Sequence, residues 1–561
     1  MIIDILNKKL EEILNRDDIH VIKSNRKELC DYQSDDVFKL AKKERRNPKE
    51  IGEEIVSKIN EIDDFSDYFD SVEFAPPGFI NIKVSSKLIN RVLKDMNTKD
   101  KFGLEKPEKV KTFILDYGGP NIAKPLHVGH MRTAIVGESI KRIITYMGHK
   151  TIADVHLGDY GLQIGQVIYG IKKDNMNPED ITLDYLEKTY PKISALCKVD
   201  DTVKEECASI TKELQDGNQE YQKLWKIILE ISGNDIKRLY KYLDVSFDLW
   251  LGESDAYKYI DKTEEFLNDK NLIEVSEGAK IVDIKDDSDT KEMPPFLFQK
   301  SNGAYLYGTT DLATIYSRMQ DYNPDNILYV VDNRQSLHFE QVFRVCRLSG
   351  LTKDTNLEFL GYGTVNGTDG KPYKTRSGDA PKLDDLFNEV KEIFLSKKEE
   401  NKNMSDEDLD IIVNAILKFA DLQNSRDRDY IFDINKFSNV VGKTGPYILY
   451  TYLRIKKILD SSGDYLDLTD DIYNEADRNL RIALTEFSIS LKNAYNEYKP
   501  SYIADYIYNL AVLANNFYQN NYVLSEKNIL KKNDWLYILN LTNKMLKELL
   551  ELIIIKIPTF M

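Results

Sequence analysis

Cysteine is scarce in this chain of 561 residues. The four cysteines, Cys30, Cys197, Cys207 and Cys346, lie far apart, and no pair has the Cys-x-x-Cys spacing. This usage indicates neither a zinc knuckle nor a disulfide framework. It fits a protein of a reducing compartment, so we expect a cytoplasmic location.

Long apolar runs are also missing. No uninterrupted apolar segment approaches the roughly 20 residues that span a bilayer. Segment 549–557 is interrupted by Glu551 and Lys556, and segment 1–14 carries charges among its apolar positions. The first pattern indicates a buried helix of a terminal bundle, and the second an amphipathic helix that is not a secretory signal. We therefore expect no membrane partner.

An excess of positive charge is absent as well, since the formal net charge is −16. This balance argues against a protein that coats nucleic acid non-specifically, although local basic tracks remain compatible with it. One such track has five basic residues on a predicted helix and the turn after it: Lys42, Lys43, Arg45, Arg46 and Lys49. Taken alone, the track is better explained as a solvated helix face than as a nucleic-acid contact.

The length predicts several domains, because one hydrophobic core does not extend over 561 residues. Residues 1–105 have the pattern of a small α/β unit, with a strand, turn and strand over 71–83. Residues 106–390 alternate between strand and helix patterns at both ends, which predicts an α/β domain with a doubly wound, Rossmann-type parallel sheet. A charged, helix-rich insertion of about 175–300 interrupts this domain. Residues 391–561 predict an α-helical bundle.

The most informative motif is His127-Val128-Gly129-His130, between a predicted strand at 111–115 and a predicted helix at 131–147. The amino end of a helix offers unpaired N–H groups to phosphate oxygens, and Gly129 permits close approach of a nucleotide. Two imidazoles at this spacing are able to donate hydrogen bonds to charge that develops on a phosphoryl group. For the bare motif, a pair of helix-capping or core histidines is an equal alternative.

A second candidate element lies about 240 residues later, where a strand pattern leads into a loop with glycine at both ends. Gly370 and Gly378 enclose three basic residues, Lys371, Lys374 and Arg376. Such a loop is suited to close over phosphates and to neutralise a pyrophosphate leaving group. On its own it also describes an ordinary surface loop, so its value lies in the pairing with the histidine motif.

Several segments together resemble the class I aminoacyl-tRNA synthetases, and within them the arginyl-tRNA synthetases. HVGH is similar to the HIGH signature, and PNIAKPLHVGHMRTAIVGES (120–139) is similar to the form found in the arginine enzymes. Further similar segments are ADVHLGDYGLQIG (153–165), VVDNRQSLHFEQVF (330–343), KPYKTRSG (371–378) and the terminal IPTFM. The resemblance covers all three predicted domains, with the insertion as its least secure part.

The resemblance implies that His127, Gly129 and His130 bind ATP and that the histidines stabilise the transition state. The second class signature, KMSKS, is poorly kept, because Pro372 stands where its first lysine belongs. The family supplies a lysine before HIGH in its place, here Lys124. We therefore expect Lys124, Lys374 and Arg376 to act as catalytic cations, with Lys371 and Lys374 near ATP.

The resemblance also implies a pocket for arginine. A guanidinium is planar, permanently charged and carries five donors, so its site must supply fixed acceptors. Asp116, Tyr307 and Asp311 match positions that hold this group, and Asn121 and Gln335 match positions that hold the α-amino and α-carboxylate ends. The alternatives are a strand-end capping role for Asp116 and a helix N-cap role for Asp311.

Together, the resemblance implies an arginine–tRNA ligase. We expect it to use ATP with Mg2+ as a substrate complex, without a dedicated protein metal site. The resemblance implies contact of 1–105 with the tRNA elbow and of 391–561 with the anticodon of tRNA(Arg), where Tyr447, Tyr450, Tyr452 and Arg454 offer stacking surfaces. One or two of these tyrosines should face RNA. We expect a monomer. The alternatives are another class I synthetase or HxGH nucleotidyltransferase, and a catalytically silent paralogue that only binds RNA.

Overall fold

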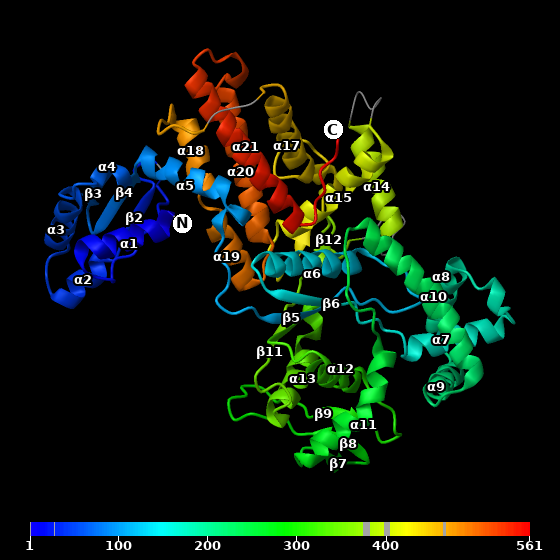
Figure 1. Ribbon diagram of the computed structural model, residues 1–561. Helices are drawn as coiled ribbons and strands as arrows, with labels where there is room; N and C mark the ends of the chain where they lie inside the picture. The colour runs from blue at the N-terminus through cyan, green and yellow to red at the C-terminus, as the bar shows by residue number, and fades with distance from the viewer. Residues whose placement is uncertain (1, 27, 374–381, 398–403, 464–466) are drawn as a thin grey trace.

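The computed structural model describes residues 2–26, 28–373, 382–397, 404–463 and 467–561. Figure 1 shows the N-terminal unit at one side, a sheet with its helices below the centre, and the C-terminal helices above it. Among the described residues, no helix has the length and apolar character needed to cross a membrane.

The N-terminal unit is a four-stranded antiparallel sheet covered by helices. Its strand order is β1-β2-β4-β3. Strands β3 (Phe69–Ala75) and β4 (Phe79–Val84) form the hairpin that the sequence predicts around 71–83. The other elements are β1 (Ile22–Lys23), β2 (Tyr32–Ser34), α1 (Ile2–Leu14), α2 (Val37–Glu44), α3 (Pro48–Asn60), α4 (Phe65–Tyr68), α5 (Ser86–Thr98) and the 3-10 helix η1 (Asp100–Gly103).

The central sheet is parallel throughout, with the order β11-β10-β5-β6, which confirms the predicted α/β architecture. Its strands are β5 (Thr112–Tyr117), β6 (Lys150–Asp154), β10 (Asn326–Val330) and β11 (Asn356–Phe359). Alternation along β5 decides which helices cover it. Phe113 and Leu115 pack into the core that contains α6 (Val128–Tyr146), whereas Ile114 packs into the core of α12 (Tyr307–Asp321) and α13 (Ser336–Ser349).

The insertion is helical in its first part, as predicted, but it continues into a small antiparallel sheet that the sequence did not reveal. Strand β7 is exposed at every position and β8 has no apolar alternation, so neither carries the period-two signal of a half-buried strand. Helix α7 (Leu162–Lys173) precedes the insertion, whose elements are η2 (Pro178–Asp180), α8 (Leu183–Leu196), α9 (Asp201–Gln215), α10 (Gln219–Tyr242), α11 (Glu253–Asp269), β7 (Glu274–Ser276), β8 (Ala279–Val282) and β9 (Phe296–Gln299).

The C-terminal helices pack against the face of α6 that points away from the sheet, so α6 lies between the two layers (Figure 1). A short parallel pair, β12 (Val365–Asn366) and β13 (Tyr430–Ile431), lies beside this junction. The helices are α14 (Leu383–Ser396), α15 (Asp406–Leu422), α16 (Ile434–Phe437), α17 (Gly445–Asp460), α18 (Glu475–Leu484), α19 (Phe487–Glu497), α20 (Ser501–Asn520), η4 (Val523–Ser525) and α21 (Ile529–Leu552).

Candidate active site

The histidine motif forms the first turn of α6. His127 is the N-cap residue, and its Nδ1 accepts a hydrogen bond from the Gly129 N–H at 3.1 Å. His130 Nδ1 accepts from the His127 N–H, also at 3.1 Å, and the two ring centroids lie 3.9 Å apart. Because each Nδ1 is an acceptor, a neutral ring carries its proton on Nε2. Both imidazoles therefore present an Nε2–H donor.

The surroundings keep both rings neutral. Loss of hydration, followed by the charges of Lys124 and Arg334, lowers the pKa of His127. Burial, followed by the charges of His127 and Lys124, lowers the pKa of His130 to about 3. At neutral pH the pair consists of uncharged donors, while Lys124 and Arg334 supply the positive charge.

Gly129 lies against the ring of His127. A Cβ atom built on it would lie 3.0 Å from Cε1 of His127 and 3.2 Å from Nδ1. Any side chain at this position would press on the ring whose Nδ1 caps the helix. Glycine at this position leaves the ring of His127 free to cap the helix without displacement.

The predicted phosphate loop is only partly described. Lys374 and Arg376 lie outside the described residues, and Lys371 is exposed. The chain that follows the loop returns to the histidine motif, since the Leu383 N–H donates to the Leu126 carbonyl at 3.0 Å. Lys124, on the other side of the motif, places Nζ 4.7 Å from the centre of the Tyr190 ring.

Asp311 lies in the second turn of α12. Its Oδ2 is 2.6 Å from Nε2 of His338, and the His338 ring centre is 4.8 Å from that of Tyr307. The helix begins at Tyr307 with Leu306 as its N-cap, so the alternative N-cap role for Asp311 is wrong. Tyr307 is exposed, which leaves the face of its ring accessible.

Asp116 was expected to hold the guanidinium of the substrate, but in the structure it holds the guanidinium of Arg318. Arg318 Nη2 donates to Oδ2 of Asp116 and to Oδ2 of Asp154, each at 2.6 Å. Arg318 is almost fully buried, and its Nη1 donates to the Tyr329 hydroxyl at 3.1 Å. Asp116 is thus committed to an ion pair at the end of β5, where alternation turns it toward α12.

Asp116, Asp154 and His156 also have ligand atoms within 4.8 Å of one another, a spacing that suits a metal ion. The two carboxylates already hold the Arg318 guanidinium. A divalent cation bound here would lie next to that buried positive charge. The donor set therefore fits an internal ion pair better than a metal site.

Sequence reasoning missed two further groups beside Asp311. Glu253, the first residue of α11, has its pKa raised to about 7 by burial and by the nearby charges of Asp311 and Asp159, against the influence of His156. His338 belongs to segment 330–343, which carries part of the resemblance. Its pairing with Asp311 was not predictable, because the two residues lie 27 positions apart on different helices. A Gly-Glu-Ser at a helix start was the available signal for Glu253.

The histidine pair and the acidic group both lie at the carboxyl ends of strands of the central sheet. Thr133 Oγ1 of α6 donates to the Val330 carbonyl at 2.7 Å and accepts from the Gly118 N–H at 3.1 Å, which joins α6 to the ends of β10 and β5. Asn121 forms a bridge with Gly158, and the adjacent Leu157 forms one with Gly252, next to Glu253.

Gln335 ends the short η3 turn (Asn333–Gln335) and is exposed. Its neighbour Arg334 is close enough to lower the pKa of His127. An acidic group around Asp311 and Glu253 thus lies on the same edge of the sheet as the histidines and their cations.

The C-terminal helices carry a surface hollow of about 680 Å³. The guanidinium carbon of Arg454 lies 4.0 Å from the centre of the Tyr518 ring on its wall. Tyr450 is exposed there, whereas Tyr452 is buried and Tyr447 is half-buried beside Asn515.

The basic track of the N-terminal unit is largely paired with acids. Lys43 Nζ is 3.0 Å from Asp18, and Arg46 Nη2 is 2.9 Å from Glu54. Lys49 Nζ lies 3.7 Å from Glu53. Phosphate groups that bind here would have to compete with these exposed ion pairs, which are individually weak.

Comparison with known proteins gives a consistent result. Residues 91–434 match the family model for the catalytic domain of class I tRNA synthetases (R), residues 1–84 the arginyl tRNA synthetase N-terminal domain, and residues 448–561 the DALR anticodon binding domain. The chain is 41% identical to the arginine–tRNA ligase of Alkaliphilus oremlandii over 95% of its length and 94% of that protein. It is also 41% identical to the one from Agathobacter rectalis, with 94% of each chain covered.

Solved structures agree. The arginyl-tRNA synthetase of Plasmodium falciparum superposes with a TM-score of 0.83 at 25% identity and covers 100% of this chain and 99% of its own. That of Thermus thermophilus has a TM-score of 0.81 at 19% identity, with both chains covered completely, and supports the fold. The parallel sheet, the paired histidines that cap α6 and these matches show that the chain belongs to the arginyl family of class I tRNA synthetases.

Proposed function

We propose that the chain is an arginine–tRNA ligase. It activates arginine with ATP to arginyl-adenylate and pyrophosphate, and then transfers arginine to the 3′-terminal ribose of tRNA(Arg). The observation that carries this proposal is that a neutral pair of Nε2–H donors and an acidic group both lie at the carboxyl edge of one parallel sheet. The first suits a triphosphate, and the second suits a cationic side chain.

In the first step, a carboxylate oxygen of arginine attacks the α-phosphorus of ATP, and the bond to the β-phosphate oxygen breaks. The carboxylate is already ionised, so the step needs no general base. His127 and His130 donate from Nε2 to phosphate oxygens as charge develops on them. Neutral rings suit this role, because they give hydrogen bonds without losing a proton.

Lys124 adds fixed charge beside the histidines, and we assign Lys371, Lys374 and Arg376 to the departing pyrophosphate. The return of the chain to Leu126 just after the loop supports this assignment. Mg2+ enters with ATP as part of the substrate. In the second step, a ribose hydroxyl attacks the carbonyl carbon, its proton leaves, and AMP departs.

Asp311 and Glu253 receive the guanidinium, and Tyr307 covers it. Asn121 and Gln335 bind the α-amino and α-carboxylate ends. Asp116 acts through Arg318, whose charge balances two carboxylates that would otherwise add to the acidic group. Lysine in this pocket would leave acceptors unpaired, at a cost of about 1 to 3 kcal/mol for each one.

For the chain as a whole, we propose domains at 1–105, 106–390 and 391–561. The first contacts the tRNA elbow, and the last reads the anticodon through the hollow beside Tyr450 and Arg454. A monomer is sufficient, because every side chain invoked comes from one chain. Four free thiols support a reducing, cytoplasmic location.

The activity is tested by exchange of labelled pyrophosphate into ATP, with and without tRNA(Arg). Arginine should support exchange, whereas lysine, cysteine and glutamate tested in parallel should not. Exchange that follows another amino acid would overturn the substrate assignment. RNA binding without any exchange would favour a silent paralogue.

The tautomer assigned to the histidines predicts which substitutions are tolerated. In His130→Gln the amide nitrogen takes the place of Nε2, whereas in His130→Asn it takes the place of Nδ1. The glutamine variant should keep part of the exchange rate, and the asparagine variant should lose about 100-fold in kcat. The same order should hold for His127. Single-turnover rates of adenylate formation measure it, and a more active asparagine variant would contradict the Nε2 assignment.

The acidic group predicts a selective loss in Asp311→Asn. The amide keeps the size and a hydrogen-bonding atom near His338 but removes the charge, so arginine affinity should fall about 10- to 100-fold. ATP affinity should change little. Calorimetric titration of each ligand measures both. Asp321→Asn, an exposed position at the end of the same helix, is the matched control, and equal losses for arginine and ATP would show that Asp311 is misplaced.

The raised pKa of Glu253, about 7, predicts a pH dependence. Its carboxylate is ionised above this pKa and neutral below it, so attraction for the guanidinium grows as pH rises. The kcat/KM for arginine should increase about tenfold from about pH 6 to pH 8. Glu253→Gln should flatten this profile, whereas Glu264→Gln on the same helix should keep the slope. An unchanged slope in Glu253→Gln would assign the ionisation to another group.

A further inference from the structure

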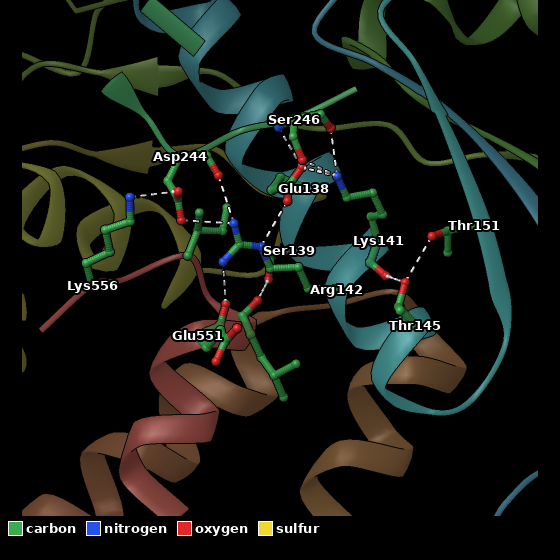
Figure 2. A network of polar contacts seen from close by, with 12 residues as sticks. Glu138, Ser139, Lys141, Arg142, Thr145, Thr151, Asp244, Ser246, Glu551 and Lys556 are labelled. Carbon is green, nitrogen blue, oxygen red and sulfur yellow. Dashed lines mark hydrogen bonds and ion pairs between the residues drawn. The ribbon is translucent and has the colours of Figure 1, made fainter. Parts of the chain in front are cut away.

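The carboxyl end of α21 is capped by side chains from other elements. The last carbonyls of a helix have no partners within it. Arg142 Nη1 of α6 donates to the Glu551 carbonyl at 3.0 Å, and Ser139 Oγ of α6 donates to the Leu552 carbonyl at 2.8 Å. Lys418 Nζ of α15 donates to the Ile554 carbonyl at 2.9 Å. Figure 2 shows Ser139 and Arg142 directed at this end of α21.

The turn after α21 is held in a strained conformation. The Ile555 N–H donates to the Leu550 carbonyl at 2.8 Å, and Ile554 has φ of 62° at the position where such helix ends use glycine. A β-branched residue is an outlier in this region of backbone space. Ile554 is also fully buried. Such a residue persists only where its neighbours fix it, so the turn marks one defined place against α6 and α15.

Arg142 joins three segments at once, as Figure 2 shows. Its Nε donates to Glu138 at 2.9 Å on its own helix, and its Nη2 donates to the carbonyl and the carboxylate of Asp244, at 2.8 and 3.0 Å, just after α10. With the bond to Glu551, every nitrogen of the guanidinium has a partner. Lys556, beyond α21, reaches Asp244 at 2.9 Å and closes the network.

The same helix carries the histidine pair at its amino end. Ser139 and Arg142 follow His130 by nine and twelve positions, which corresponds to about 14 and 18 Å along the helix axis. A helix transmits a displacement along its axis with little loss, and a shift of about 1 Å at reacting groups is enough to slow a reaction 100-fold.

We propose that Arg142 and Ser139 are positioning residues through which the end of α21 fixes α6, and thereby the place of His127 and His130 at the phosphates. This inference rests on the proposed function. The proposed arginine pocket lies on α11 and α12, on the other face of the sheet. The contacts of Arg142 and Ser139 with the end of α21 therefore govern the chemical step and leave arginine binding unaffected.

Arg142→Met is the principal variant, assayed as pyrophosphate exchange with saturating ATP and tRNA(Arg). We expect kcat to fall about 10- to 100-fold with the KM for arginine unchanged. Arg142→Lys should recover part of the rate. Lys141→Met is the matched control, because Lys141 also contacts Glu138 and bonds to Ser246 but forms no bond to α21 within the described part of the chain. Its kcat should stay within about twofold of the wild-type value.

Ser139→Ala supplies an independent arm if the arginine variant does not fold. It removes one donor with almost no change in volume, and kcat should fall about 3- to 10-fold at constant arginine KM. In the double variant, kcat should fall by less than the product of the two single reductions, because both residues act through the same contact between α6 and the end of α21. If the wild-type protein shows exchange and neither Ser139→Ala nor Arg142→Met lowers kcat, the inference is overturned. It is also overturned if Lys141→Met lowers kcat as much as Arg142→Met does. Absence of exchange in the wild type would instead overturn the proposed function.

Discussion

Helix α6 is buried between the parallel sheet and the C-terminal helices, and the position of its amino end decides where the paired imidazoles lie. Thr133 ties its first turns to the ends of β5 and β10, and Arg132, fully buried, donates to the Gly363 carbonyl at 2.6 Å. Buried polar side chains of this kind accept few alternative positions, because each displaced donor would lose its partner without gaining water. The catalytic geometry is therefore a property of the whole three-layer packing and not of the histidine motif alone.

The internal ion pair of Arg318 shapes the electrostatics on the opposite face. Five carboxylates, those of Asp116, Asp154, Asp159, Glu253 and Asp311, lie in one neighbourhood: in addition to burial, the charge of Asp154 raises the pKa of Asp116, the charges of Asp311 and Asp159 raise that of Glu253, and the charges of Asp116 and Asp311 raise that of Tyr329. Arg318 binds two of them, and Ser254 donates twice to Asp159, at 3.0 and 2.6 Å. Within the described residues, neither Arg318 nor Ser254 bonds to Asp311 or Glu253, and the partner of Asp311 is the His338 ring. Two carboxylates are thus available for the guanidinium in the proposed pocket, while Asp116, Asp154 and Asp159 already have partners.

The sequence predicted what depends on nearby residues. Apolar periodicity predicted a strand at 111–115 and a helix at 131–147, and the structure has them at 112–117 and 128–146. Helix capping, one of the two alternatives for the histidine pair, is what His127 does. The partners of Asp116 and Asp311 were not predictable in this way, because Arg318 and His338 lie 202 and 27 positions away and carry no local signal. Glu253 is a similar case: its raised pKa arises only when α11 packs beside α12. The small sheet β7-β8-β9 escaped notice because its exposed first strand has no buried face.

Alternation of side chains along β5 determines which residues lie on each face of the sheet. Leu115 and Tyr117 turn toward α6, which places the helix with the paired histidines on one face, and Asp116 between them turns toward α12, which places the acids on the other. A one-residue slip of this strand would exchange the two sets and place a carboxylate under α6. Register is held by pairing on both sides, Asp116 with Tyr329 of β10 and with Asp154 of β6. The separation of the histidine pair and its neighbouring cations from the acidic group therefore follows from the period of a single buried strand.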